Sequence, residues 1–167
     1  MNINLLLICL FLSLNISAQS IHEDMAALSG NWTGTLSYLD YSDDESQSTL
    51  NCTMKVEWKD KRGKLFIGFE EPNGKIYYDK SSIRIIGSGD SIQFDGHKYT
   101  IKHFNKDNGT GFWTLIVERS GKDNRKSSTI RQSFMYQGDK ISLVKEVKYN
   151  DIKDYFVRNS YVLRRGK

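Results

Sequence analysis

The sequence predicts an all-β protein: an antiparallel, up-and-down β-barrel of about eight to ten strands with a short N-terminal helical turn. Three observations lead to this prediction. Apolar and polar residues alternate along most of the chain, turn-forming residues recur at short intervals, and the one proline falls within a turn. Alternation with period two is typical of half-buried strands. Because consecutive hairpins leave unpaired strand edges unless they close, we expect a barrel.

The N-terminal segment, residues 1–19, has the pattern of a secretory signal peptide. An apolar run covers residues 5–14 and is followed by small and polar residues around Ala18, as expected of an apolar core and its cleavage site. The run is shorter than the ~20 apolar residues that cross a bilayer, so a membrane anchor is the less favoured alternative. We therefore expect an exported protein without a membrane span, in the periplasm, at the cell surface or secreted to the medium.

Removal of this segment leaves residues 20–167 as one domain of about 150 residues, with Cys52 as its one cysteine. A lone cysteine cannot form an internal disulfide, so the fold must be stabilised by its core. The 24 basic and 20 acidic residues of the full chain are intermixed, and the sequence contains no nucleic-acid-binding motif. We expect a monomer whose partner is a small hydrophobic molecule rather than a nucleic acid.

The first expected elements are a helical turn and the strand that follows it. The turn covers residues 23–28 and is ended by Gly30, since glycine is a common C-terminal stop. The first strand begins at this glycine and carries Trp32. An acidic loop, residues 41–48, then joins it to the second strand; the loop lacks the ligand spacing of a calcium site.

Residues 49–59 form the clearest alternating stretch. Cys52 falls on its apolar face, where a small buried side chain is expected and a catalytic thiol is the alternative. The chain then turns and returns as the strand 64–70, with Lys59 expected opposite Lys64. The later strands lie between turns at residues 71–74, 87–90, 95–96, 105–109, 121–124, 137–140 and 150–154.

The last three strands allow a register to be derived. Counting from the turn at 137–140 pairs Tyr136 with Ile141, and counting from the next turn pairs Tyr149 with Tyr155. The expected cross-strand pairs are then Ile130–Val147, Gln132–Lys145, Phe134–Leu143, Val147–Val157, Lys145–Asn159 and Leu143–Tyr161. A row of polar residues therefore crosses three strands within an otherwise apolar wall.

Lys145 lies at the centre of this row, between Gln132 and Asn159. Because an unpaired ammonium group is costly to bury, Lys145 must find partners. One hypothesis is that the three residues hold the anionic or carbonyl head of a mostly apolar ligand; the alternative is an internal hydrogen-bonded row, with Lys145 extending towards the barrel mouth. The remaining ligand contacts are expected from Tyr38, Trp58, Phe134 and Tyr161.

The two ends of the chain resemble a known family. The motif Gly30-Asn31-Trp32 opens the first strand, and the last strand ends in Tyr-Val-Leu-Arg-Arg, residues 161–165. Together they resemble the calycin superfamily, the lipocalin-like barrels, and in particular bacterial secreted members. The resemblance implies that Trp32 packs across the closed end of a barrel under an arginine, which by parity is Arg165 rather than Arg164. It also implies a ligand inside the barrel and a lid over its mouth at the first loop.

Other chemistry has little support in the sequence. His22, His97 and His103 are too few and too scattered for a zinc site, and no catalytic motif is present. We therefore expect neither a metal, a cofactor nor an enzymatic activity. One alternative is that His103, on an inward strand face, is an axial haem ligand, as in some bacterial relatives of this barrel.

Two functional hypotheses follow. The first is an exported lipocalin-like barrel that binds a small, mostly apolar molecule, with an anionic head as one option, in its interior. The second is a ligand-free barrel whose interior is filled by side chains and which acts as a structural or protein-interaction module of the cell envelope. A third, a lipocalin-like enzyme, would need a reactive residue beside a general base. An interior cavity below about 300 Å³ would contradict the first hypothesis.

Overall fold

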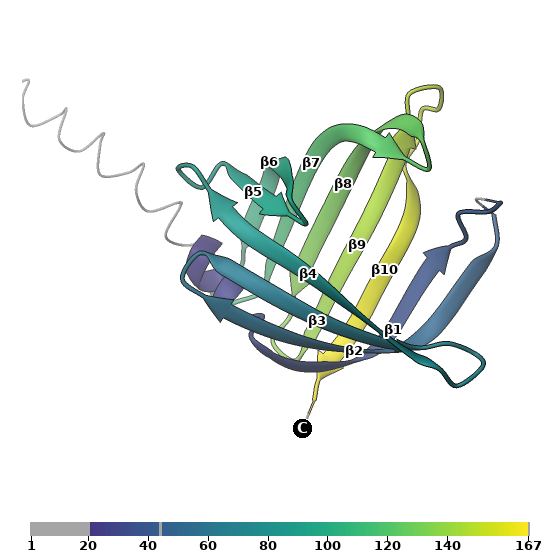
Figure 1. Ribbon diagram of the computed structural model, residues 1–167. Helices are drawn as coiled ribbons and strands as arrows, with labels where there is room; N and C mark the ends of the chain where they lie inside the picture. The colour runs from purple at the N-terminus through teal and green to yellow at the C-terminus, as the bar shows by residue number, and fades with distance from the viewer. Residues whose placement is uncertain (1–20, 44, 167) are drawn as a thin grey trace, which may run out of the picture.

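A computed structural model describes residues 21–43 and 45–166. It shows ten antiparallel strands closed into one barrel, in which each strand pairs with its neighbours in sequence and β1 pairs with β10 (Figure 1). The strands are β1 (Gly30–Leu39), β2 (Gln47–Lys59), β3 (Arg62–Glu70), β4 (Ile76–Ile86), β5 (Ser91–Phe94), β6 (His97–Lys106), β7 (Trp113–Asp123), β8 (Lys126–Tyr136), β9 (Lys140–Tyr149) and β10 (Phe156–Arg165). The predicted fold class is therefore confirmed. The expected signal peptide, residues 1–19, lies outside the described residues.

A short helix, residues 21–26, covers one end of the barrel (Figure 1). Its residues Ile21 and Met25, with Leu28 just beyond it, are buried in the barrel core. Asp24 is also buried and accepts a 2.6 Å ion pair from Lys106 on β6. The helix therefore closes this end with apolar side chains. Within the described part of the chain, no helix is long and apolar enough to cross a membrane.

The interior is built by the alternation seen in the sequence. Along β2, Leu50, Cys52, Met54 and Val56 are buried, and the residues between them are exposed. Cys52 is thus a buried residue of the barrel wall. Because each strand contributes every second side chain to the inside, a continuous core forms without a disulfide.

The turn between β2 and β3 is tighter than expected. Lys59 lies opposite Arg62, not Lys64, because the chain reverses through only two residues and Asp60 adopts a left-handed conformation with φ of 51°. The expected register is therefore wrong by two residues. A shift of two leaves every side chain on its original face, so Met54 still points inward, now opposite Ile67.

In the last three strands the predicted register holds between β8 and β9 and, between β9 and β10, from Asn159 onward; a β-bulge in β10 separates this part from the segment next to the turn. The pairs of Lys145 with Gln132 and with Asn159 are those expected. Below them the irregularity between Val157 and Asn159 places Phe156, rather than Val157, opposite Val147. A bulge inserts one extra residue and redirects its neighbours.

Two side chains change sides as a result of this bulge. Val157 is turned outward and is 46% exposed, whereas Arg158 points inward and is fully buried. The expected Val147–Val157 pair is therefore wrong, and a charged residue enters the barrel at a position that strict alternation places outside.

A second bulge, in β6, moves His103. The register shifts between Ile101 and His103, and the His103 side chain is exposed while Phe104 packs against the core. The alternation of Tyr99, Ile101 and His103 predicts an inward histidine, and this is wrong. The haem alternative thereby loses the inward ligand on which it depended.

Candidate functional site

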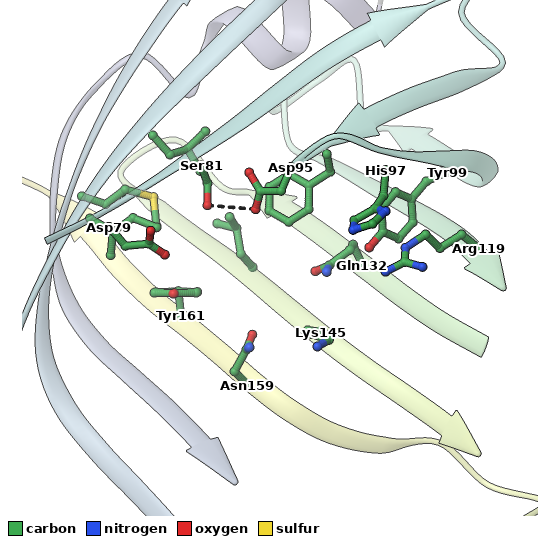
Figure 2. Close-up of a pocket in the computed structure, with 15 residues that line it drawn as sticks. Asp79, Ser81, Asp95, His97, Tyr99, Arg119, Gln132, Lys145, Asn159 and Tyr161 are labelled. Atoms are coloured by element: carbon green, nitrogen blue, oxygen red, sulfur yellow. Dashed lines mark hydrogen bonds between the residues drawn. The ribbon is translucent and has the colours of Figure 1, made fainter. Parts of the chain in front are cut away.

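The barrel holds a cavity of about 330 Å³. One wall comes from β2, β3 and β4, and the facing wall from β7, β8, β9 and β10; β5, β6 and the turn between them complete the lining (Figure 2). Ligand sites in proteins span about 300–1,000 Å³, so this cavity is at the small end of that range. Because the cavity is partly open to solvent, this volume does not test the lower limit set for an enclosed interior.

Apolar residues form one part of the lining. Met54 from β2, Leu65 and Ile67 from β3, and Leu143 from β9 are all buried and face the cavity. Phe94 from β5 completes this part. Such a surface offers dispersion contacts and water exclusion to a hydrocarbon group.

The polar row predicted from the sequence forms part of the wall built by β7–β10. Gln132, Lys145 and Asn159, from β8, β9 and β10, occupy adjacent positions and line the cavity (Figure 2). Tyr161 lines it one inward position further along β10. Burial, and next the nearby Cys52, raises the pKa of the Tyr161 hydroxyl, so this group is a hydrogen-bond donor at neutral pH.

The other expected contact residues lie outside the cavity lining. Phe134 is buried behind it and makes an edge-to-face contact with Phe94 at 5.9 Å between ring centroids. Tyr38 lies directly opposite Asn159 and packs partly buried against the core. Trp58 lies at the closed end, where its Nε1 donates to the carbonyl of Asp60. Trp58 is thus remote from the row that the other residues form.

Lys145 is engaged by an acidic residue that the sequence analysis missed. Its Nζ lies 2.6 Å from the carboxylate of Asp123, the last residue of β7. The same carboxylate accepts from the buried Arg158 at 3.0 Å, and Arg158 also donates to the Tyr149 hydroxyl at 2.8 Å. The triad of Asp123, Lys145 and Arg158 therefore satisfies the lysine internally.

Tyr41, in the β1–β2 loop, covers this triad. Its ring centroid lies 4.5 Å from the guanidinium carbon of Arg158, and its hydroxyl accepts from Lys145 at 3.2 Å. Its carbonyl accepts from the side chain of Asn124 in the β7–β8 turn at 3.0 Å. The loop is thus attached across the open end of the barrel to residues more than 80 positions away in sequence.

Further polar residues of the lining come from β4, from the β5–β6 turn and from β7, beside His97 on β6, which the sequence analysis named only among the scattered histidines. Asp95, at the rim, accepts from the Ser81 hydroxyl at 3.0 Å and from the backbone of Ser82 at 2.8 Å. Asp79 and Arg119 also line the cavity (Figure 2). The sequence analysis named none of these, although the inward parity of β7, from Trp113 through Arg119, is readable from its alternation.

The chemistry of the cavity lining is compatible with binding a small molecule. It combines an apolar surface with hydrogen-bond donors and acceptors, and it contains both cationic and anionic side chains. Across residues 21–43 and 45–166, no cluster of three or more histidine, cysteine, aspartate or glutamate side chains is placed to hold a metal ion.

Comparison with known proteins identifies the fold and not a family. No protein-family model matches the sequence, and no curated protein matches it. Among solved structures, Rv2717c from M. tuberculosis superposes with a TM-score of 0.58 at 11% sequence identity, covering 87% of this chain and 96% of that one. The barrel architecture is therefore one that a solved protein shares over nearly its whole length.

Proposed function

We propose that this chain is an exported, lipocalin-like barrel that binds one small amphipathic molecule in its interior. The observation that carries the proposal is the cavity of about 330 Å³, whose lining combines apolar with polar and charged side chains on both facing walls. A barrel that served only as a packed structural unit would fill this space with side chains. The proposal also includes a monomeric, non-catalytic protein and export directed by residues 1–19.

The lining indicates how such a molecule would lie. Its hydrocarbon part would pack on Leu65, Ile67 and Leu143, which are buried. Its polar part would face the row that contains Gln132 and Asn159, whose amide groups can both donate and accept hydrogen bonds. The volume limits the ligand to a molecule smaller than most drugs.

Native mass spectrometry of the protein purified from its own source tests the proposal. We expect a mass excess at a ratio of one molecule per chain that disappears on denaturation. A protein that carries no additional mass, and that also gains none when incubated with small amphipathic compounds, would contradict it.

A cavity-filling variant makes the same test specific to the interior. Leu143→Trp places a large ring in the space that the ligand would occupy, and we expect the bound mass to be lost. The matched control is Val144→Trp, on the same strand but outside the cavity lining. Loss in both variants, or in neither, would argue against the cavity as the site.

One surface feature favours the second candidate, a protein-interaction module. Ile76, Tyr77 and Tyr78 at the start of β4 are consecutive and are 53%, 40% and 81% exposed. Exposed apolar patches can mark contact sites. A photo-crosslinking residue at Tyr78 should then give one specific product in the source organism, and the interior should be empty by mass spectrometry.

A further inference from the structure

Arg119 differs from the other cation that lines the cavity. Lys145 is paired with the Asp123 carboxylate at 2.6 Å, whereas Arg119 forms no ion pair with any residue that the structure describes. Its Nη1 donates at 3.3 Å to the carbonyl of its own neighbour, Ser120. Its Nε is buried and has no hydrogen-bond partner among those residues. The cavity therefore contains one cation whose charge is not neutralised locally.

The position of this guanidinium is set by two neighbours. Its carbon lies 5.2 Å from the ring centroid of Tyr99, which lines the cavity beside it (Figure 2). The second neighbour is Gly121, two residues further along β7, where an added Cβ would lie only 1.9 Å from Nη1. Any side chain at residue 121 would thus displace the guanidinium. The guanidinium of Arg119 therefore lies near the Tyr99 ring, in space that is open because residue 121 has no side chain.

A partly buried guanidinium without an ion-pair partner is well suited to bind a carboxylate. Partial burial of an unpaired cation is unfavourable, so a carboxylate that enters recovers this cost. The planar fork of N–H donors on arginine matches a carboxylate in two parallel hydrogen bonds. Contact with an aromatic ring restricts the fork before the ligand arrives.

The wall across the cavity carries the opposite charge. Asp79 lies in that wall and Asp95 at the rim beside it, and neither forms an ion pair with a lysine, arginine or histidine within residues 21–43 and 45–166. Asp95 is held in place by hydrogen bonds from Ser81 and Ser82. These carboxylates would repel a second anion and attract a hydrogen-bond donor or a cation. Figure 2 shows Arg119 and Asp79 at opposite sides of the site.

We infer that Arg119, and not Lys145, binds the carboxylate of the ligand, and that the ligand is a small amino-carboxylate whose amino group faces Asp79 and Asp95. The methylene groups between its two charges would lie on Leu65, Ile67 and Leu143. This inference rests on the proposed function, because it requires that a molecule occupies the cavity.

The test is an NMR titration of the full chain with four six-carbon probes. They are 6-aminohexanoate, hexanoate, hexylamine and hexanedioate. We expect 6-aminohexanoate to bind most tightly and hexanedioate to bind at least about tenfold more weakly, since its second carboxylate meets the aspartates. Hexanedioate binding as tightly as 6-aminohexanoate would overturn the assignment of the amino group.

Variants at and around Arg119 identify its role. Arg119→Gln should weaken 6-aminohexanoate and hexanoate about tenfold or more and leave hexylamine, which has no carboxylate, within about twofold. Gly121→Ala should have the same selective effect, because it moves the guanidinium without removing its charge. Arg84→Gln, an exposed position on β4, is the matched control. Lys145→Met should weaken carboxylate binding less than Arg119→Gln does.

The outcomes separate this inference from the proposed function. Two results with probes that bind would contradict the assignment of Arg119 while leaving interior binding intact. In the first, Arg119→Gln and Gly121→Ala leave carboxylate binding unchanged. In the second, Lys145→Met weakens carboxylate binding more than Arg119→Gln does. If no probe binds and the protein from its own source carries no ligand, both fail. Thermal unfolding of each variant checks that it folds; equal melting temperatures with selectively weakened carboxylate binding support the inference.

Discussion

Arg165 lies across the ring of Trp32, with its guanidinium carbon 4.3 Å from the ring centroid. The two residues are opposite each other where β10 meets β1. The same guanidinium donates to the carbonyls of Ala27 and Ser29, at 3.1 and 3.0 Å, just after the helix. One side chain therefore ties the last strand, the first strand and the chain segment before β1 together at the closed end.

Replacement of Arg165 by methionine should destabilise the barrel by about 2 kcal/mol, because it removes the cation from the Trp32 ring and leaves two carbonyls without their donor. Arg164→Met is the matched control: Arg164 is 71% exposed and, among the residues that the structure describes, forms its ion pair with the similarly exposed Asp139, so its loss should cost less than about 1 kcal/mol. Denaturant unfolding measures both. Equal effects would show that the contact with Trp32 contributes nothing.

Asp123→Asn should be among the most destabilising single substitutions in this protein. It leaves Lys145 and the fully buried Arg158 without their carboxylate, and removal of one partner from a buried ion pair costs about 3–5 kcal/mol. Asp139→Asn, which affects an exposed pair, should change the free energy of unfolding by less than about 1 kcal/mol. A small effect of Asp123→Asn would mean that the triad is not an important part of the fold.

Glu118 should make stability depend on pH. Burial alone would raise the pKa of Glu118, but hydrogen bonds from Arg131 at 2.9 Å and from the Tyr155 hydroxyl at 3.0 Å outweigh it, and the pKa is lowered from its ordinary value of 4.5. A lowered pKa in the folded state stabilises the protein above pH 4.5, and this contribution is lost as the pH falls below that value.

The variant Glu118→Gln isolates this contribution. It should be about 1–2 kcal/mol less stable than the parent protein at neutral pH, and the difference should shrink as the pH falls below the ordinary glutamate value. Urea unfolding at several pH values provides the measurement, and the exposed Glu70→Gln controls for the loss of one carboxylate. A difference that grows towards acidic pH would contradict the assignment.

Cys52 should be unreactive in the folded protein. Burial raises the pKa of its thiol from 9.0 to about 11, so the thiolate fraction at pH 8 falls roughly a hundredfold. Alkylation by iodoacetamide, followed at the Cys52 peptide by mass spectrometry, should be correspondingly slower than in urea. If Cys52 in the folded protein were alkylated as fast as in urea, the alternative of a reactive thiol would be supported instead.

Much of the candidate site was accessible from sequence because short turns fix a register. The turn between β8 and β9 places Gln132 opposite Lys145 as counted. The turn between β9 and β10 starts a register one residue away from the expected one, and the bulge in β10 restores the expected pair of Lys145 with Asn159. Trp58 illustrates the limit of the same reasoning. Trp58 shares a face with Met54 but lies further along β2, towards the closed end. Alternation predicts which face of a strand a residue is on, but not how far along the barrel axis it lies.

Two bulges account for the side chains that were predicted on the wrong face of their strands. One extra residue in β10 brings Arg158 inside and turns Val157 out, and one in β6 exposes His103. The alternation of apolar and polar residues along one strand cannot locate a bulge, because the side chains that a bulge redirects are stabilised by partners on other strands. Here the partner of Arg158 is Asp123, 35 residues earlier in the chain.

The sequence by itself determined the all-β barrel, the alternation of its walls and the polar row, because strand periodicity and turn chemistry act between residues that are close along the chain. Only the tertiary structure decided which charges neutralise each other. It pairs Lys145 and Arg158 with Asp123 and leaves Arg119 unpaired beside Gly121. The physical reason is that electrostatic attraction and desolvation depend on distance in space, and barrel closure brings together residues that the sequence keeps far apart.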